Sequence, residues 1–130
     1  MDAFQTHGAP SWSELTTTDP SAAAEFYGKL LGWTFESMDM AGGTYRVVKV
    51  GDTAVAGIMG QPLGAPPMPP AWGTYVTVDN LDECVKRAAE LGGKQIVPPS
   101  DVPGVGRFAV IQDPQGAVLS LMTYERRTGD

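Results

Sequence analysis

The sequence predicts an α+β fold built from two tandem modules, each with the element order β-α-β-β-β. Two observations on residue spacing support this fold class. A Trp precedes an Asp by seven residues in both halves, Trp12 before Asp19 and Trp72 before Asp79. In both halves a Gly follows that Asp by 13 residues, where a helix would end. The repeated spacing favours an internal duplication of one supersecondary unit.

The first half of the sequence supplies a strand and a capped amphipathic helix. Residues 12–18 suit a strand, because Leu15 lies among Thr-rich positions that favour extended backbone. Thr18 or Asp19 is expected to cap the helix, and Pro20 suits its first turn. The apolar face of this helix follows the spacing i, i+3, i+4, i+7 and i+8 at Ala23, Phe26, Tyr27, Leu30 and Leu31.

Three further strands are expected in the first half, with turn-forming pairs between them. The strands fall at residues 33–37, 44–50 and 53–59. Gly42-Gly43 and Gly51-Asp52 supply the two turns, because both pairs tolerate the left-handed backbone that tight hairpins require. The first half therefore reads β-α-β-β-β.

The second half repeats this order. A helix capped by Asp79 or Asn80 carries an apolar face at Leu81, Val85, Ala88 and Ala89 and stops at Leu91-Gly92-Gly93. Strands are expected at residues 72–78, 95–97, 107–112 and 117–124. The stretch DPQG at 113–116 is typical of a turn, with Pro and Gly at the positions that a turn favours.

The two modules divide the chain into five segments. An N-terminal tail, the first module, a Pro-rich linker, the second module and a C-terminal tail are expected at residues 1–9, 10–60, 61–71, 72–124 and 125–130. The Pro-rich stretch is either only a linker or a partly ordered flap over a ligand site. The stretch VPPSDVPGVGR at 97–107 leaves the same two alternatives open.

Composition excludes several functional classes. The formal net charge of −6 makes nucleic acid a poor choice of partner, because phosphates repel an acidic surface. No apolar run reaches the length of a membrane-spanning helix, and the N-terminus lacks the pattern of a signal peptide. Cys84 is the single cysteine, so an intramolecular disulfide is impossible. Together these features favour a cytoplasmic protein that binds neither nucleic acid nor membranes.

The sequence contains one histidine, His7, in the predicted N-terminal tail. Sites built on two or three histidines therefore cannot form within one chain. A Ser-His-Asp or Cys-His arrangement would require His7 to fold back into a pocket. A mobile or surface position for His7 is the favoured expectation.

Two motifs in this order resemble those of the vicinal oxygen chelate superfamily. They are TTDPSAAAEFYGKLLGW at 17–33 and DPQGAVLSLM at 113–122, and the resemblance covers residues 10–124. That superfamily includes glyoxalase I, extradiol dioxygenases, fosfomycin-resistance enzymes and bleomycin-resistance proteins. The resemblance implies that each module curls a sheet, that the paired sheets enclose a cavity, and that the helices lie outside.

The metal enzymes of this superfamily place four ligands in that cavity, usually His and Glu. The corresponding positions here fall at Trp12, near Gly57, at Gly73 or Trp72, and at Ser120. These residues offer no imidazole, thiolate or carboxylate to Zn, Fe or Mn. The resemblance therefore implies a chain with no metal site and no cofactor.

Strand parity then predicts a ligand pocket on the cavity face. If Trp12 faces the cavity, Glu14 and Thr16 do too, while Leu15 packs under the helix. Such a lining suits a flat and largely apolar ligand with a few polar anchors. The candidate ligand-binding residues are Trp12, Glu14, Tyr45, Val55, Gly57, Met59, Trp72, Gly73, Tyr75, Phe108, Ser120 and Met122.

Each candidate also has a structural alternative. Trp12 and Tyr75 would serve equally as core aromatics. Glu14 is harder to dismiss, because an inward carboxylate needs a partner or water. Arg46 and Arg107 lie on predicted strands and are possible partners for it. Gly57 and Gly73 are expected to leave room for a ligand.

Three functions remain open. The resemblance to the bleomycin-resistance branch implies a metal-independent, homodimeric protein that sequesters an aromatic or cationic natural product and so confers antibiotic resistance. The alternative is a metal-independent enzyme, an isomerase, cyclase or hydroxylase-like protein, acting on a polyketide-like or other aromatic molecule. Glu14 would then be its general base, with Tyr75 or Ser120 as hydrogen-bond donor. The third is an interaction module with a filled cavity.

Overall fold

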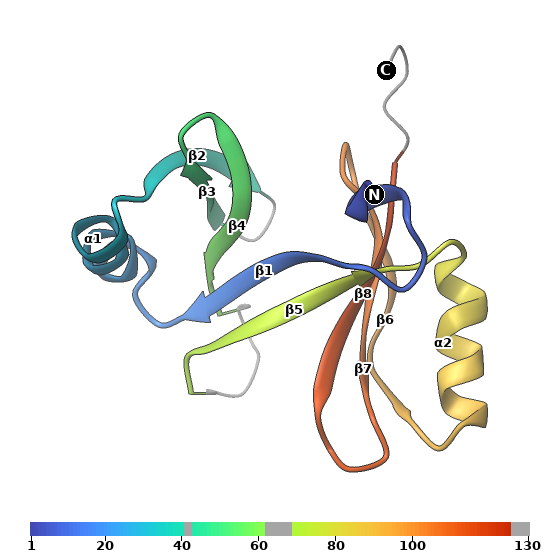
Figure 1. The fold of residues 1–130 in the computed structure, drawn as a ribbon. Helices are drawn as coiled ribbons and strands as arrows, with labels where there is room; N and C mark the ends of the chain where they lie inside the picture. Colours follow the sequence, from blue (N-terminus) through green and yellow to red (C-terminus); the bar gives the residue numbers. More distant parts are fainter. Residues whose placement is uncertain (41–42, 62–68, 126–130) are drawn as a thin grey trace. The chain divides into compact units, whose positions relative to one another are not determined.

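The computed structural model describes residues 1–40, 43–61 and 69–125 (Figure 1). The chain forms two compact units. The first unit is Trp12–Gly73, and the second unit combines Met1–Ser11 with Thr74–Asp130. The predicted order of elements, β-α-β-β-β twice, is confirmed.

The first unit holds most of the first module. Its elements are β1 (Pro10–Thr17), α1 (Pro20–Leu31), β2 (Thr34–Met40), β3 (Gly43–Val50) and β4 (Thr53–Gly60). The strand order is β2-β3-β4-β1. β4 pairs antiparallel with β3 and parallel with β1, so β4 lies between these two strands.

Local sequence signals explain where α1 begins and ends. The carboxylate of Asp19 accepts the backbone N–H of Ala22 at 3.1 Å, and Pro20 occupies the first turn. Gly32 ends the helix in the left-handed conformation, with φ of 77°. The inner side of α1 packs through Ala23 and Tyr27 against a core of Leu15, Val48, Ala56 and Ile58. Leu15 thus lies under the helix, as strand parity predicts.

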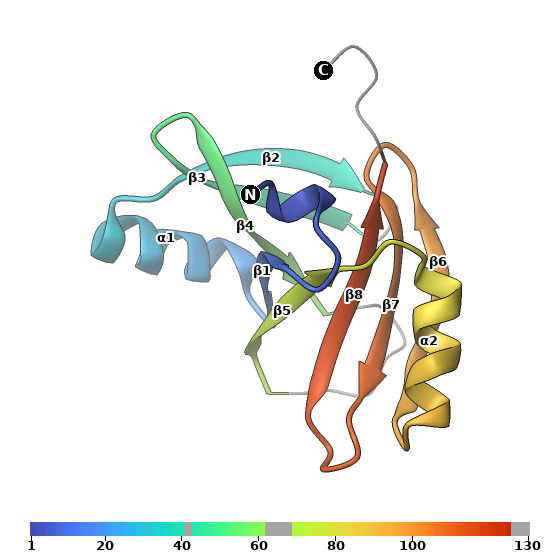
Figure 2. The same cartoon turned by 45° about the vertical axis from the view of Figure 1, so that its right-hand side comes forward.

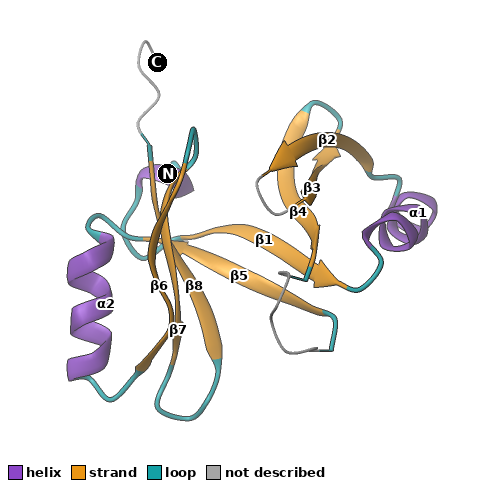
Figure 3. Ribbon diagram, turned by 180° about the vertical axis from the view of Figure 1, so that it is seen from behind, coloured by secondary structure: helices purple, strands orange, loops and turns teal. Residues whose placement is uncertain are grey.

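The second unit repeats the plan with the other strands. Its elements are the second part of β5 (Ala71–Thr77), from Thr74 on, and α2 (Leu81–Glu90), β6 (Lys94–Val102), β7 (Gly106–Gln112) and β8 (Val118–Tyr124). The strand order is β5-β8-β7-β6. Asn80 is the residue that caps α2, through the backbone N–H of Glu83 at 3.2 Å. Figures 2 and 3 show α2 along one face of these strands, where it covers a core of Val78, Leu81, Val85, Ala109 and Leu121.

The strand β6 is longer than the predicted strand at 95–97. It runs through Pro98 and Pro99 as far as Val102, so much of the stretch at 97–107 is strand and not linker or flap. The position of β6 at the end of the strand order explains this, because a Pro on an edge strand removes no hydrogen bond from the interior of the sheet. The register shifts between Val97 and Ser100, where the two prolines lie.

The N-terminal residues form a structured segment on the second unit, whereas the sequence predicts a tail. They contain a short 3-10 helix, Ala3–Gln5. The backbone N–H of Gly8 donates to the carbonyl of Thr77 at 2.7 Å, and Thr77 N–H donates to the carbonyl of Ala9 at 2.9 Å. The buried Thr77 hydroxyl donates to the carbonyl of Ala3 at 2.6 Å.

The structure describes only part of the predicted Pro-rich linker and C-terminal tail. Most of the Pro-rich linker at 61–71 and of the C-terminal tail at 125–130 lies outside the described residues. Within the described part of the chain, neither helix has the length and apolar character needed to cross a membrane.

Candidate functional site

Three polar side chains form a continuous hydrogen-bond chain in the first unit. The indole N–H of Trp12 donates to the phenolic oxygen of Tyr45 at 2.9 Å. The Tyr45 hydroxyl in turn donates to a carboxylate oxygen of Glu14, also at 2.9 Å. Trp12 and Glu14 lie two residues apart on β1 and therefore share one face of the strand, opposite the helix-covered side. All three side chains are half-buried.

Gly57 is the residue that allows Tyr45 to reach Glu14. β4 separates the strands of Tyr45 and Glu14, and Gly57 on β4 is paired with both Glu14 and Val47. A Cβ atom at position 57 would overlap the Tyr45 hydroxyl and ring. The space that the sequence predicts for a ligand at Gly57 is therefore filled by Tyr45.

Of the other candidates on β4, Met59 follows the predicted parity, because it is paired with Thr16 and lies two residues from Gly57. Val55 lies where the register between β3 and β4 shifts, so alternation alone does not assign its face. A Cβ at Gly73 would come no closer than 3.9 Å to the nearest atom, the carbonyl oxygen of Glu14. Gly73 thus leaves room beside β1, whereas Gly57 does not.

Trp72 belongs to a separate aromatic group next to α1. Its indole N–H donates to the Tyr27 hydroxyl at 3.1 Å, and its ring lies 6.0 Å from that of Trp33. Tyr27 and Trp33 are themselves stacked at 5.5 Å and pack against the core beneath α1. Trp72 therefore does not join the Trp12–Tyr45–Glu14 group.

The four candidates of the second unit share one face of its strands. Tyr75 is paired with Ser120, and Phe108 with Met122. Their strand neighbours Val76 and Leu121 instead pack in the core beneath α2. Met122 is only 6% exposed, so it serves as a core residue here.

The two arginines considered as partners of Glu14 have other roles. Arg46 donates to the Ser21 hydroxyl of α1 at 2.8 Å, on the helix side of the sheet. Arg107 donates two hydrogen bonds to the Asp82 carboxylate and one to Asp101, each at 3.0 Å. The Arg107 hydrogen bonds hold the pKa of Asp82 below its usual value, and those carboxylates raise the pKa of Arg107.

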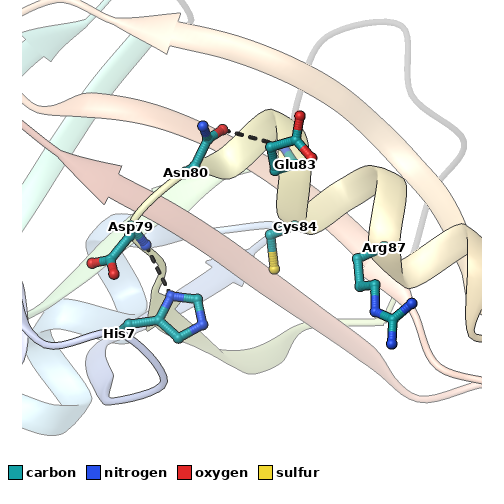
Figure 4. Close-up of a pocket in the computed structure, with 6 residues that line it drawn as sticks. All are labelled: His7, Asp79, Asn80, Glu83, Cys84 and Arg87. Atoms are coloured by element: carbon teal, nitrogen blue, oxygen red, sulfur yellow. Dashed lines mark hydrogen bonds between the residues drawn. The ribbon is translucent and has the colours of Figure 1, made fainter.

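A cavity that the sequence did not predict lies at the start of α2 (Figure 4). Its volume is about 410 Å³ and its lining residues are His7, Asp79, Asn80, Glu83, Cys84 and Arg87. His7 is exposed, as expected, but its Nδ1 atom accepts the backbone N–H of Asp79 at 3.0 Å. Burial raises the pKa of the Cys84 thiol, which keeps it protonated. Neither side chain is arranged as an activated nucleophile.

The donor set does not fit a bound transition metal. Positions 12, 57, 73 and 120 hold Trp, Gly, Gly and Ser, and Glu14, on the same strand as Trp12, accepts a hydrogen bond from Tyr45. In residues 1–40, 43–61 and 69–125, no three His, Cys, Asp or Glu side chains are grouped so that they could hold a metal ion.

Relatives of known name match most of the chain. CFP32 of Mycobacterium tuberculosis, provisionally named a glyoxylase, is 45% identical over 116 residues, which cover 88% of this chain and 44% of CFP32. DnrV of Streptomyces peucetius, named an anthracycline biosynthesis protein, is 34% identical over 127 residues, covering 88% of this chain and 46% of DnrV. The chain therefore spans a little under half the length of these relatives.

Solved structures agree on the fold. The crystal structure of methylmalonyl-CoA epimerase from Mycobacterium tuberculosis superimposes with a TM-score of 0.66, covering 94% of this chain and 92% of the epimerase. The sequence identity is 18%, so this likeness concerns the fold alone. A model of the Glyoxalase/Bleomycin resistance protein/Dioxygenase superfamily matches residues 9–121. The chain therefore belongs to the glyoxalase/bleomycin resistance protein/dioxygenase superfamily.

Proposed function

We propose that this protein binds a small aromatic molecule without the help of a metal, and that it sequesters this molecule unchanged. The observation that carries the proposal is the Trp12–Tyr45–Glu14 group, in which two linked aromatic side chains orient a carboxylate on a half-buried sheet face. Aromatic rings bind flat apolar ligands, and a carboxylate fixes their orientation. Positions 12, 57, 73 and 120 offer no ligand set for a metal.

The relatives support a ligand of this kind. DnrV is named for anthracycline biosynthesis, and anthracyclines are polycyclic aromatic compounds. The name of the superfamily includes proteins of bleomycin resistance. On this proposal the protein acts in the cytoplasm, and protection of a cell from a toxic aromatic compound would be its biological role.

A second candidate is a metal-independent enzyme with Glu14 as the general base. The hydrogen bond from Tyr45 favours this candidate, because it fixes the position of the carboxylate relative to any bound ligand. An isomerisation or cyclisation of an aromatic substrate would require only proton transfers. The relatives named for biosynthesis or as a glyoxylase are compatible with this reading.

We also propose that two chains pair. The helix α1 exposes Phe26, Leu30 and Leu31 by 58%, 62% and 54%, and none of its residues is buried. The charged neighbours Glu25 and Lys29 form an ion pair at 2.8 Å, so this face carries little net charge and would not repel its copy. CFP32 and DnrV are about twice as long as this chain, so each is long enough to contain a second domain of this size.

Fluorescence from Trp12 tests the proposed function. The double variant Trp33→Phe/Trp72→Phe removes the two tryptophans beside α1 and leaves Trp12 as the reporter. It would be titrated with a panel of polycyclic aromatic compounds, with the compound recovered afterwards and the protein assayed for bound metal. Saturable quenching, unchanged compound and no stoichiometric metal are expected.

The other outcomes separate the alternatives. Conversion of a compound by the wild type, but not by Glu14→Gln, would establish the enzyme in place of the sequestering protein. A stoichiometric metal would overturn metal independence. If no compound quenches the fluorescence and circular dichroism shows a folded protein, the third function, an interaction module with a filled cavity, would be favoured.

A further inference from the structure

We propose that His7 acts as a pH-sensitive latch for the N-terminal segment, residues 1–9. A neutral imidazole holds this segment against the start of α2 in the second unit, and a protonated imidazole releases it. The proposal is independent of the ligand-binding function above. It follows from one hydrogen bond, drawn in Figure 4, that a neutral imidazole can make and a charged imidazole cannot.

This hydrogen bond requires the neutral form of the imidazole. The backbone N–H of Asp79 donates to the Nδ1 atom of His7 at 3.0 Å, so Nδ1 must carry a lone pair. The single N–H hydrogen of the neutral ring then lies on Nε2. In an imidazolium both ring nitrogens are donors, so neither orientation of the ring offers an acceptor to the Asp79 N–H. Protonation therefore turns a hydrogen bond into a contact between two donors.

The latch lies next to the other contacts that hold the N-terminal segment. The backbone N–H of Gly8 donates to the carbonyl of Thr77 at 2.7 Å, and the Thr77 hydroxyl donates to the carbonyl of Ala3 at 2.6 Å. Asp79 follows Thr77 by two residues, so His7 extends this attachment to the start of α2. Loss of the His7 bond is therefore expected to loosen the segment, whereas the core of the second unit, which lies beneath α2, stays folded.

The charges around His7 do not replace the lost acceptor. The titratable side chains that line the cavity with His7 are Asp79, Glu83, Cys84 and Arg87. The two carboxylates attract an imidazolium and the guanidinium repels it, and these three residues are exposed, so salt screens them. On the segment itself, the Asp2 carboxylate accepts the backbone N–H of Phe4 at 3.0 Å. Such charges influence the pH at which the proton is taken up, but they leave the Asp79 N–H facing a donor.

Solvent exchange of the backbone amides, followed by heteronuclear NMR at about pH 8 and about pH 5, tests the latch. The imidazole signals of His7, the one histidine in the sequence, report its protonation directly and should show the hydrogen on Nε2 at the higher pH. Protection is the exchange rate of an unstructured chain divided by the measured rate. It should fall about three- to tenfold at Asp79 and Gly8 when the imidazole becomes charged. The Glu83 amide, which donates to the Asn80 side chain, should keep its protection.

Two variants separate the acceptor from the charge. His7→Asn places a carboxamide oxygen near the position of Nδ1 and does not titrate, so protection at Asp79 and Gly8 should stay high at both pH values. His7→Leu has a methyl group there, and protection should be low at both pH values.

Three results would overturn the latch. The first is equal protection of Asp79 in the wild type with a neutral and with a charged imidazole. The second is a pH dependence that persists in His7→Asn. The third is a loss at Asp79 with no change at Gly8, because the segment would then stay in place.

Discussion

The phenolic ring of Tyr45 lies over Gly57, where a methyl group on residue 57 would overlap the Tyr45 hydroxyl and two of its ring carbons. Gly57→Ala is therefore expected to destabilise the protein by about 1–3 kcal/mol, the usual cost of overpacking a filled site. Urea unfolding followed by circular dichroism measures this change. Gly60→Ala on the same strand is the control, because its nearest neighbour would be Pro20 Cγ at 3.7 Å. Equal losses of stability in the two variants would contradict the close packing of Tyr45 on Gly57.

Some of this architecture could be predicted because its signals are local. Asp19 and Asn80 cap their helices through contacts within three residues, and such contacts are written in the adjacent sequence. The burial of Leu15 follows from the alternation of side chains along one strand. These features are determined by neighbouring residues and not by contacts with distant parts of the chain.

The Tyr45–Gly57 relationship depends on three strands at once and could not be derived from spacing. A lone glycine within a strand does signal a close approach of some other group, but it does not say which group approaches. The sequence therefore predicted space at Gly57, where the structure has the Tyr45 ring. The face of Trp72 was equally hard to predict. Trp72 and Gly73 are neighbours and point to opposite sides of the strand, so a shift of one residue in register decides which of them faces the predicted pocket.

Two segments were mispredicted for a different reason. Pro98 and Pro99 argue against a strand in the interior of a sheet. They are compatible with β6 because it is an edge strand, and only the strand order of the folded sheet shows this.

The N-terminal residues have a polar composition that suggests a tail. Their order comes from partners far away in the sequence, such as the Thr77 hydroxyl, which donates to the Ala3 carbonyl.

The Thr77 hydroxyl is expected to anchor the N-terminal segment. Thr77→Val keeps the shape of the side chain but removes the donor to the Ala3 carbonyl, at a cost of about 1 kcal/mol. Hydrogen exchange at the amides of Gly8 and Asp79 should accelerate, because both bonds depend on the position of this segment. Thr77→Ser restores the hydroxyl and should restore much of the protection. If Thr77→Val exchanges like the wild type at both amides, the anchor lies elsewhere.

The bidentate contact between Arg107 and Asp82 should make stability depend on pH in the acidic range. Hydrogen bonds from Arg107 lower the pKa of Asp82 in the folded protein. The associated stabilisation is therefore present above the unfolded pKa of about 3.9 and disappears as pH falls through the lower folded value. Asp82→Asn should flatten this part of the stability curve, modestly and less so in high salt, because the pair is exposed.

Thermal unfolding between pH 2 and pH 6 measures this effect. Asp52→Asn, in the exposed turn between β3 and β4, is a charge-matched control and should keep the wild-type slope. A melting temperature that falls more steeply with decreasing pH in Asp82→Asn than in the wild type would contradict the proposed effect of Arg107 on Asp82.

The exposed apolar side of α1 should mediate pairing of two chains. Phe26→Ser/Leu30→Ser is expected to shift the protein from dimer to monomer in analytical ultracentrifugation, because it removes apolar area that only a partner would cover. Leu91→Ser is the matched control, since Leu91 is 64% exposed but lies in the second unit. A monomeric wild type, or a double variant that remains dimeric, would rule out this face.

Cys84 should react slowly with thiol reagents at neutral pH. Its thiol lies half-buried on α2, and burial raises its pKa, so the reactive thiolate is scarce. Alkylation by iodoacetamide, followed by mass spectrometry, should be several-fold slower in the folded protein than in urea, and should accelerate as pH rises. Because Cys84 is the only cysteine, every alkylated molecule reports on it. Alkylation at pH 7 as fast as in the unfolded chain would mean that burial does not suppress the thiolate, contrary to this prediction.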